Sequence, residues 1–502
     1  MKPTKIIAAC LIASIVSAGG CTKDFDQINT DPTLITRELM KPSLLLTYVE
    51  KNSAYEVETQ SIISEFSGYY ANPASGNIFL NRNFGDPFGS YYRNYLINIA
   101  EGIRLTAEDP TLQNQNAMFR IYKAWLFYQL TDAYGDIPYF EALNDIFELN
   151  SQPVYDSQES IYRDIFKELK EATAALSDDA AQKSFDAADI LMGGSAEKWR
   201  RFANSIRLRL ALRVRYADAA LAQENISDVI AAPLIDDNSQ NVLLQTLDDG
   251  NVENLNEFYD KNTRQPGNMN VSFTVTDNLN HLSDPRLPIF AKLPPEPAAG
   301  YRGAPIQMLQ NETQRYIEDS VSLMGDYFLQ PVYDKILINA SEVKFLRAEA
   351  ALAGFTTEDP QELFEQGIQL AMEQYGVASG DITTYLASPS GTLTGTEEQQ
   401  LEQIIVQKWL ATYYNVNEGW AEFRRTGYPR IWTGNELGDT GGNVPRRLTY
   451  PVEEYFKNQA NVTAAAGRID GGDKLLGRVW WDKKAGLPFA HPRQGMFPPE
   501  DY

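Results

Sequence analysis

The stretch of sequence that most constrains the fold runs from Met118 to Ala142. At about 100° per residue, apolar side chains cover most of the helix that this stretch predicts and leave only a narrow polar stripe. A helix with so much apolar surface must be packed on several sides. Gln129 interrupts the apolar side and would need hydrogen-bond partners inside the protein. The stretch therefore predicts a central helix that is surrounded by other helices and ended by Gly135 and Pro138.

Amphipathic segments follow one another in pairs along the rest of the chain. The residues predicted to cap helices are Asp156 with Glu159, Ser195, Asp359 with Glu362, and Thr396 with Gln399. Small residues lie where paired helices would cross, as in FLRAEAALAGFTTEDPQELFEQGIQLAMEQYG, and such pairs resemble tetratricopeptide repeats. Because the spacing between pairs is irregular, we expect a mostly α fold, in which degenerate tetratricopeptide-like helix pairs form an α superhelix.

Two segments are rich in proline, glycine and turn residues, mainly 232–339 and 431–502. They predict a loop-rich subregion with small strands, packed on one side of a helical frame that consists mainly of 44–231 and 340–430. Since the composition shows no break, we expect 44–502 to be one domain. A loop-rich face on a helical frame is a common arrangement for ligand binding, although plain connecting loops would look the same.

Residues 1–20 predict a secretory signal peptide, in which Lys2 and Lys5 precede an apolar run. The small residues directly before Cys21 resemble a bacterial lipobox, in which the cysteine is acylated, for example with palmitate, and becomes the new N-terminus. We therefore expect Cys21 to carry lipid and residues 21–43 to form a tether that leads away from the membrane. An ordinary signal peptide followed by an incidental cysteine is the alternative.

The protein is strongly acidic, with a formal net charge of −23. Loss of Lys2 and Lys5 with the signal peptide gives −25, from 42 basic and 67 acidic residues. Such a surface repels phosphate, so nucleic acid and anionic lipid headgroups are poor partners. After residue 20 no apolar run approaches the roughly 18 residues that span a bilayer. We therefore expect the protein to contact a membrane through its lipid anchor only.

The residues offer little for catalysis. Nucleophilic catalysis needs a base, most often histidine, and neither His281 nor His491 lies in a recognisable nucleophile motif. The chain has no paired histidines with zinc-ligand spacing, and no thiolate is available. We therefore expect no catalytic residue, no bound metal and no cofactor. A structural calcium ion among loop carboxylates stays possible, but no EF-hand loop assigns it a site.

Two kinds of charged cluster have both a functional and a structural interpretation. A glycosidase needs only two nearby carboxylates, and Asp132 with Asp136, or Glu418 with Glu422, could be such a pair. At this density of acids, solvated or salt-bridged carboxylates are the more common outcome. Six arginines also crowd one predicted helix, and we expect them to pair with carboxylates rather than to form a docking patch. They are Arg200, Arg201, Arg207, Arg209, Arg213 and Arg215.

Aromatic residues are abundant, and most of them belong to helical stripes that predict core positions. Others lie in or near turn-rich stretches, where a flat ring could stack on a sugar while neighbouring polar groups bind its hydroxyls. The cluster GNIFLNRNFGDPFGSYYRN is the strongest candidate for such a site. The candidate ligand-binding residues are Tyr69, Tyr70, Asn83, Phe84, Phe88, Tyr91, Tyr301, Trp480 and Trp481.

Blocks spread over nearly the whole chain together resemble a known family. They are DFDQINTDPT, YKAWLFYQLTDAYGDIPYFEAL, GGSAEKWRRFANSIRLRLALR, SDPRLPIFAK, YRGAP, SEVKFLRAEAAL, NEGWAEFRRTGYPRI and VPRRLTYPVEEY. Their order and content are similar to the SusD/RagB-like nutrient-binding outer-membrane lipoproteins, specifically the second SusD-like branch.

The resemblance implies a binding protein, not an enzyme, that is lipid-anchored in the outer membrane and faces the cell surface. It implies a helical body of four tetratricopeptide-like pairs, which covers a SusC-like TonB-dependent transporter and hands over glycans or other oligomeric nutrients. It also implies an aromatic ligand platform at Phe84, Phe88 and Tyr91, where this chain has no tryptophan. The alternatives are capture of peptides or another nutrient, a lipid-anchored glycosidase, and a structural lid without a ligand.

Overall fold

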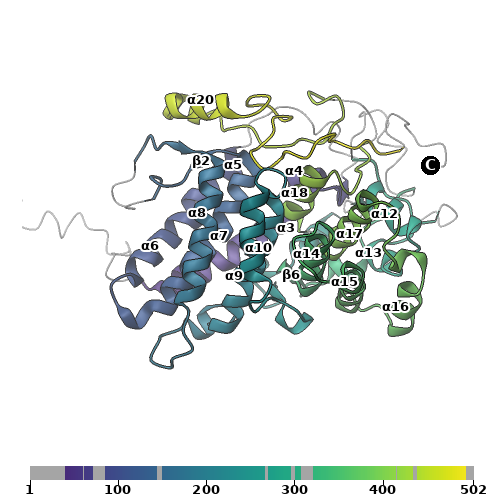
Figure 1. Ribbon diagram of the computed structural model, residues 1–502, viewed down its shortest axis with the longest axis horizontal. Helices are drawn as coiled ribbons and strands as arrows, with labels where there is room; N and C mark the ends of the chain where they lie inside the picture. The colour runs from purple at the N-terminus through teal and green to yellow at the C-terminus, as the bar shows by residue number, and fades with distance from the viewer. Residues whose placement is uncertain are drawn as a thin grey trace, which may run out of the picture.

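The computed structural model describes residues 40–59, 61–71, 85–143, 150–265, 270–294, 300–306, 320–413, 415–433 and 438–492. Within these ranges the protein is mostly α-helical, which confirms the predicted fold class. Figure 1 shows two groups of helices side by side, with an irregular C-terminal segment running along one edge of both. The predicted signal peptide, Cys21 and most of the tether lie outside the described residues.

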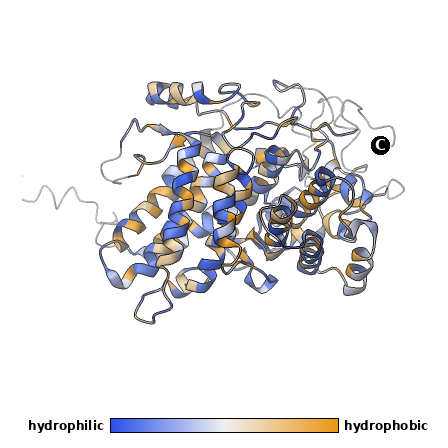
Figure 2. Cartoon of the chain, in the orientation of Figure 1, coloured by the Kyte–Doolittle hydropathy of each residue, from blue (hydrophilic) through white to orange (hydrophobic). Residues whose placement is uncertain are grey.

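Antiparallel helix pairs form the frame. Its helices are α3 (Pro42–Thr59), α4 (Ser61–Phe66), α5 (Gly85–Ser90), α6 (Ile97–Thr106), α7 (Gln113–Tyr134), α8 (Gln158–Ala175), α9 (Ala196–Val214), α10 (Ala219–Val229), α14 (Ala340–Leu352), α15 (Pro360–Gln374), α16 (Ser379–Leu386), α17 (Glu397–Ala411) and α18 (Val416–Thr426). The main pairs are α6 with α7, α7 with α8, α9 with α10, and α14 with α15. These helices carry hydrophilic and hydrophobic residues together (Figure 2), as expected when one face is buried.

Small residues allow the paired helices to approach closely. A Cβ atom at Gly367 of α15 would lie 2.7 Å from the ring of Phe345 in α14, which is too close for any larger residue without a shift. The tetratricopeptide-like crossing predicted from the sequence is therefore present between these two helices.

The central helix α7 is buried along most of its length. It ends at Gly135, whose φ of 87° favours glycine and whose amide donates to the carbonyl of Thr131. Gln129 is buried and hydrogen-bonded as predicted: its amide donates to the Trp125 carbonyl, and its oxygen accepts from Asn417. Thr131 is also fully buried, and its hydroxyl donates to the carbonyl of Gly135.

Most of the predicted helix caps are confirmed. Ser195 and Asp359 accept backbone amides at the starts of α9 and α15, and Thr396 with Gln399 forms a complete capping box on α17. The prediction for Asp156 was wrong. The neighbouring Ser157 caps α8, while the Asp156 carboxylate accepts the amides of Tyr139 and Phe140.

Short elements form the loop-rich subregion. Within the described ranges, the strands of this subregion and of the adjoining frame make three antiparallel two-stranded pairs: β1 (Tyr70–Ala71) with β5 (Asn270–Val271), β2 (Ile137–Pro138) with β3 (Tyr155–Asp156), and β4 (Val242–Gln245) with β6 (Asp334–Ile338). Its helices are α11 (Glu257–Arg264), α12 (Phe273–His281), α13 (Leu287–Phe290), α19 (Glu454–Lys457) and α20 (Gln459–Arg468).

All six arginines of the cluster around α9 pair with carboxylates, as predicted. The partners are Asp178 for Arg200, Glu197 for Arg201, Asp228 for Arg207, Glu342 for Arg209, Asp132 and Glu418 for Arg213, and Glu349 for Arg215. Arg209 and Arg213 lie in the core, where an unpaired charge would be very costly. Their partners come from α7, α14 and α18, so this network joins four helices.

The Arg209 guanidinium is the best coordinated of these groups. It makes two bonds of 2.7 Å to the Glu342 carboxylate and one of 2.8 Å to the Tyr128 hydroxyl. It also donates to the carbonyl of Leu337, so its buried donors are well satisfied.

A buried acid lies on α3, beside the turn that precedes α9. Glu50 is fully buried, and its carboxylate accepts the amide of Ile190 at 2.9 Å. Burial, together with the charge of the neighbouring Asp189, raises the pKa of Glu50 well above its ordinary value of 4.5. Asp189 holds the turn together, because it accepts the indole N–H of Trp199 and the amides of Met192 and Gly194.

Replacing Arg209 by alanine should cost roughly 3–5 kcal/mol of unfolding free energy, because it leaves Glu342 buried without a counter-charge. Arg163→Ala is the matched control, since this exposed arginine pairs with Glu159 and Asp218 at the surface. The control should lose less than about 1 kcal/mol. Urea denaturation midpoints measure both values, and equal losses would contradict the role assigned to the network.

The variant Glu50→Gln should gain stability over the wild type as the pH rises. Below pH 4.5, Glu50 is protonated in both the folded and the unfolded state, so the substitution has little effect. Above that value the unfolded chain ionises while the folded one keeps its proton, so the wild type loses about 1.4 kcal/mol per pH unit up to the folded pKa. Urea denaturation midpoints of the variant and the wild type at pH 5 and pH 8 measure this difference in stability. If the two proteins change in parallel with pH, the raised pKa of Glu50 is refuted.

Candidate functional site

The structure separates the aromatic candidates into three groups, while Asn83 and Phe84 lie outside the described residues. The first group is in the loop-rich subregion, where β1 pairs with β5 and Ser272 forms a bridge to Ala304. These contacts bring the segments of Tyr70 and Tyr301 together. Both side chains are half-buried. Tyr69 is fully buried, stacks on Trp409 at 4.6 Å and donates its hydroxyl to the Trp409 carbonyl.

The second group, Phe88 and Tyr91, lies around the start of α6. The Phe88 ring is buried between Tyr134 and Tyr155, at centroid distances of 5.1 and 6.3 Å. Tyr91 is also buried and makes an edge contact with Tyr95. In this structure neither ring offers an open face to a ligand.

The third group, Trp480 and Trp481, lies against the ion-pair network. The buried Trp481 ring packs near Arg213, and its indole N–H donates to Asp132 at 2.7 Å. Trp480 is half-buried beside Tyr162. Of the described aromatic candidates, only Tyr70, Tyr301 and Trp480 therefore keep part of their rings accessible.

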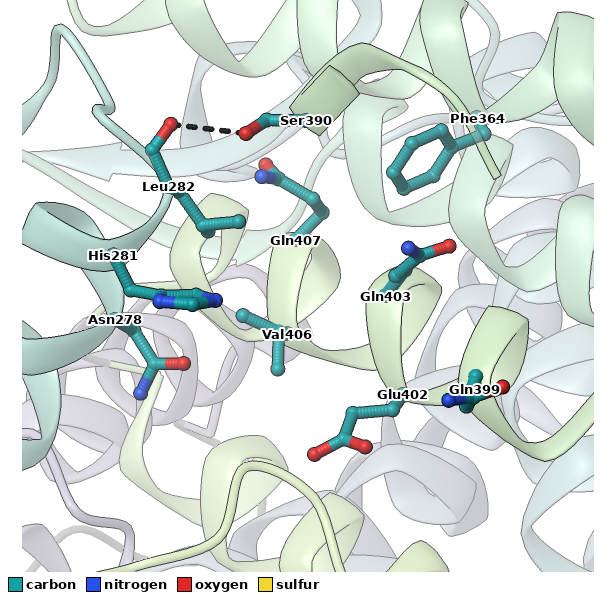
Figure 3. Close-up of a pocket in the computed structure, with 10 residues that line it drawn as sticks. All are labelled: Asn278, His281, Leu282, Phe364, Ser390, Gln399, Glu402, Gln403, Val406 and Gln407. Atoms are coloured by element: carbon teal, nitrogen blue, oxygen red, sulfur yellow. Dashed lines mark hydrogen bonds between the residues drawn. The ribbon is translucent and has the colours of Figure 1, made fainter. Parts of the chain in front are cut away.

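A pocket of about 340 Å³ lies between the C-terminal end of α12 and helix α17. Figure 3 shows the ring of His281 reaching from α12 into this hollow, with the glutamines of α17 on the opposite side. The lining residues are Asn278, His281, Leu282, Phe364, Ser390, Gln399, Glu402, Gln403, Val406 and Gln407. We call it the α12–α17 pocket. Its volume falls within the roughly 300–1,000 Å³ of small-molecule sites.

A buried hydrogen-bond network forms the floor of this pocket. Arg286 is fully buried and binds the Asp284 carboxylate with bonds of 2.9 and 2.6 Å. It also donates to the side-chain oxygen of Gln407 at 2.6 Å, and the Gln407 amide in turn donates to the hydroxyl of Tyr385. The burial of Gln407 is therefore fully compensated, and the floor is rigid.

The wall of the pocket is polar but nearly neutral. Glu402 is paired with Arg430 at 2.9 Å, so its charge is largely balanced. The side-chain NH2 group of Asn278 donates to the Thr274 carbonyl, and its side-chain oxygen has no hydrogen bond within the described part of the chain. His281 is exposed, and its ring likewise makes no hydrogen bond to any described residue. The arrangement suits an uncharged ligand with several hydroxyl or amide groups.

This pocket was not identified from the sequence, although the residue spacing that forms one of its walls is visible in the sequence. Gln399, Gln403 and Gln407 recur every four residues and so share one face of α17. The opposing wall comes from α12, more than a hundred residues earlier in the chain. No local pattern connects these two segments.

The proposed acid pairs are parts of the core. Glu418 lies against Arg209 and Arg213, and Glu422 against Lys408 and Arg425. Burial alone would raise the pKa of each glutamate, but the neighbouring cations outweigh it and lower both values.

Asp132 and Asp136 are similarly engaged. Burial raises the pKa of both. Asp132 nevertheless pairs with Arg213 and accepts from Tyr162, while Asp136 pairs with Arg468. None of these four carboxylates lines the α12–α17 pocket, and all four are engaged by cations of the described chain, so glycosidase chemistry gains no support at these residues.

No metal-ligating group of three or more histidine, cysteine or acidic side chains occurs among the described residues. Within the same ranges, none of the helices has the length and apolar character needed to span a bilayer.

Comparisons with known proteins give consistent results. The family described as "Starch-binding associating with outer membrane" matches residues 33–451. No curated protein matches the chain. Among solved structures, one described as a chitin-binding protein is 27% identical, with a TM-score of 0.77 over 88% of this chain and 100% of that one.

Two further structures have similar scores. A chitin-binding SusD homolog from Flavobacterium johnsoniae is 25% identical, with a TM-score of 0.73 over 88% of this chain and 98% of that one. A SusD homolog from Bacteroides fragilis is 26% identical, with a TM-score of 0.74 over 89% and 100%.

Proposed function

Because this chain belongs to the SusD-like family of starch-binding proteins that associate with the outer membrane, we propose that it captures oligosaccharides at the cell surface. In this proposal Cys21 carries the lipid anchor, and the bound sugar passes to a SusC-like TonB-dependent transporter. The observation that carries the proposal is the family match over 33–451, joined to a fold shared with a chitin-binding protein over 88% of the chain.

The α12–α17 pocket is our candidate for the oligosaccharide site. Its glutamines, the Asn278 side-chain oxygen and the exposed His281 ring offer donors, acceptors and a flat surface to a sugar. The half-buried Tyr301 lies beside this region, because Asn280 at the end of α12 donates to the Tyr301 carbonyl. Asn83 and Phe84 lie outside the described residues and remain candidates from the sequence alone.

The charge of the protein favours neutral ligands. A formal charge of −23 repels anionic polymers, whereas the almost neutral pocket wall imposes no charge requirement of its own. Two of the similar structures are described as chitin-binding, so oligomers of N-acetylglucosamine are the first ligands to test. The acetamido groups of such a ligand could exchange hydrogen bonds with side-chain amides.

The double variant Asn278→Ala with His281→Ala should bind the recognised oligosaccharide at least about tenfold more weakly, which corresponds to 1.4 kcal/mol. The substitutions remove one acceptor and the flat ring from the pocket wall, and neither side chain makes a long-range hydrogen bond to a described residue. Isothermal titration calorimetry against chitotriose, maltotriose and cellotriose measures the effect.

Gln369→Ala is the matched control, because this exposed glutamine of α15 bonds only to Glu373 one turn further along its helix. It should leave the affinity unchanged. An unaltered affinity in the double variant would place the ligand elsewhere. If calorimetry of the wild-type protein detects binding of peptides but of none of the glycans, the proposal of oligosaccharide capture is wrong.

A further inference from the structure

A second hollow, of about 280 Å³, lies at the other end of the molecule. It is lined by residues of α6, α7 and α8 and by the turn that follows β2. Figure 1 places α6 and α12 toward opposite ends of the longest axis, so this hollow is well separated from the α12–α17 pocket. We call it the α6–α8 hollow.

An exposed aromatic ring forms one side of the hollow. Phe140 is 48% exposed, and it is held in place by its backbone amide, which donates to Asp156 at 2.9 Å. Its ring rests edge-on against Tyr139, whose own ring packs against Phe127 at 4.5 Å. Phe127, Tyr139 and Phe140 therefore form a row of contacting rings from the core to the surface. The last ring, Phe140, is exposed to solvent, and its backbone is fixed by the bond to Asp156.

Three charged side chains line the same hollow: Arg104, which is balanced by its ion pair with Glu101, and Lys123 and Asp164, which have opposite signs. Asp164 accepts the Tyr139 hydroxyl at 2.8 Å through one carboxylate oxygen, and the other has no hydrogen bond within the described ranges. The Lys123 ammonium lies 5.2 Å from the centre of the Tyr139 ring and makes no ion pair or hydrogen bond to a described residue. The hollow thus offers a donor and an acceptor beside an accessible ring.

This combination suits a neutral sugar unit. The apolar face of a pyranose can cover the Phe140 ring, while its hydroxyls donate to Asp164 and accept from Lys123. Because the two charges balance, neither an anionic nor a cationic ligand is favoured. The volume of the hollow lies near the lower limit of small-molecule sites. It would therefore hold only a short part of a polysaccharide.

We propose that the α6–α8 hollow is a second glycan-binding site, and that a long polysaccharide occupies it together with the oligosaccharide site. The inference rests on the proposed function and extends it from short oligomers to polymers. Binding one chain at two separated points raises the apparent affinity without any new contact at either site. The arrangement would hold a polymer along the surface of the protein.

The variants Phe140→Ala and Asp164→Asn should reduce binding to the polymer at least tenfold while leaving the oligosaccharide site intact. Asparagine keeps the acceptor for Tyr139, so Asp164→Asn tests the charge without removing that bond. Phe456→Ala is the matched control, because Phe456 is 83% exposed and does not line the hollow. The probes are colloidal chitin and insoluble starch in depletion assays, with chitotriose and maltotriose in calorimetry.

Wild-type protein should bind two trimers per chain, and each Phe140 or Asp164 variant should bind one with an unchanged unfolding midpoint. If Phe140→Ala binds polymer and trimer as the wild type does, the second site is refuted while oligosaccharide capture stands. If the wild-type protein binds none of the glycans, the proposed function fails and the second site fails with it.

Discussion

The structure depends on buried charges that pair across helices. Arg209 and Arg213 of α9 lie in the core and are neutralised by Glu342 of α14, Glu418 of α18 and Asp132 of α7. Such pairs add little net stability compared with a well-packed apolar core, but loss of one partner is severe. Their main effect is therefore to fix which helices meet and in which register. A second buried set, Arg425 with Glu349 and Glu422, joins α14 and α18 in the same way.

This rigid frame determines where ligands can bind. Its interior is filled by aromatic rings and paired charges. The α12–α17 pocket lies between those two helices, and the α6–α8 hollow lies between the turn after β2 and helices α6, α7 and α8. Residues in these places are held by hydrogen bonds: Arg286 donates to the Gln407 side chain, and the backbone amide of Phe140 donates to Asp156. Binding at such positions requires little reorganisation.

Local features of the fold could be read from the sequence, since a cap, a helix stripe or a buried glutamine depends on neighbours within a few residues. Asp156 was misassigned because Ser157, an equally good cap, follows it directly. How deeply each aromatic ring is buried could not be predicted from the sequence. Phe88 and Trp481 lie in turn-rich sequence, yet both rings are buried by residues distant in the chain. The α12–α17 pocket was missed for the same reason, because its two walls come from distant segments.

The long separation between charged partners has a consequence for how the chain folds. Arg209 is made 133 residues before Glu342, and Arg213 is made 205 residues before Glu418. Until those glutamates emerge from the ribosome, α9 cannot enter a dry interior, because its guanidinium groups must stay hydrated. Burial of α9 is therefore completed only when α14 and α18 pack against it.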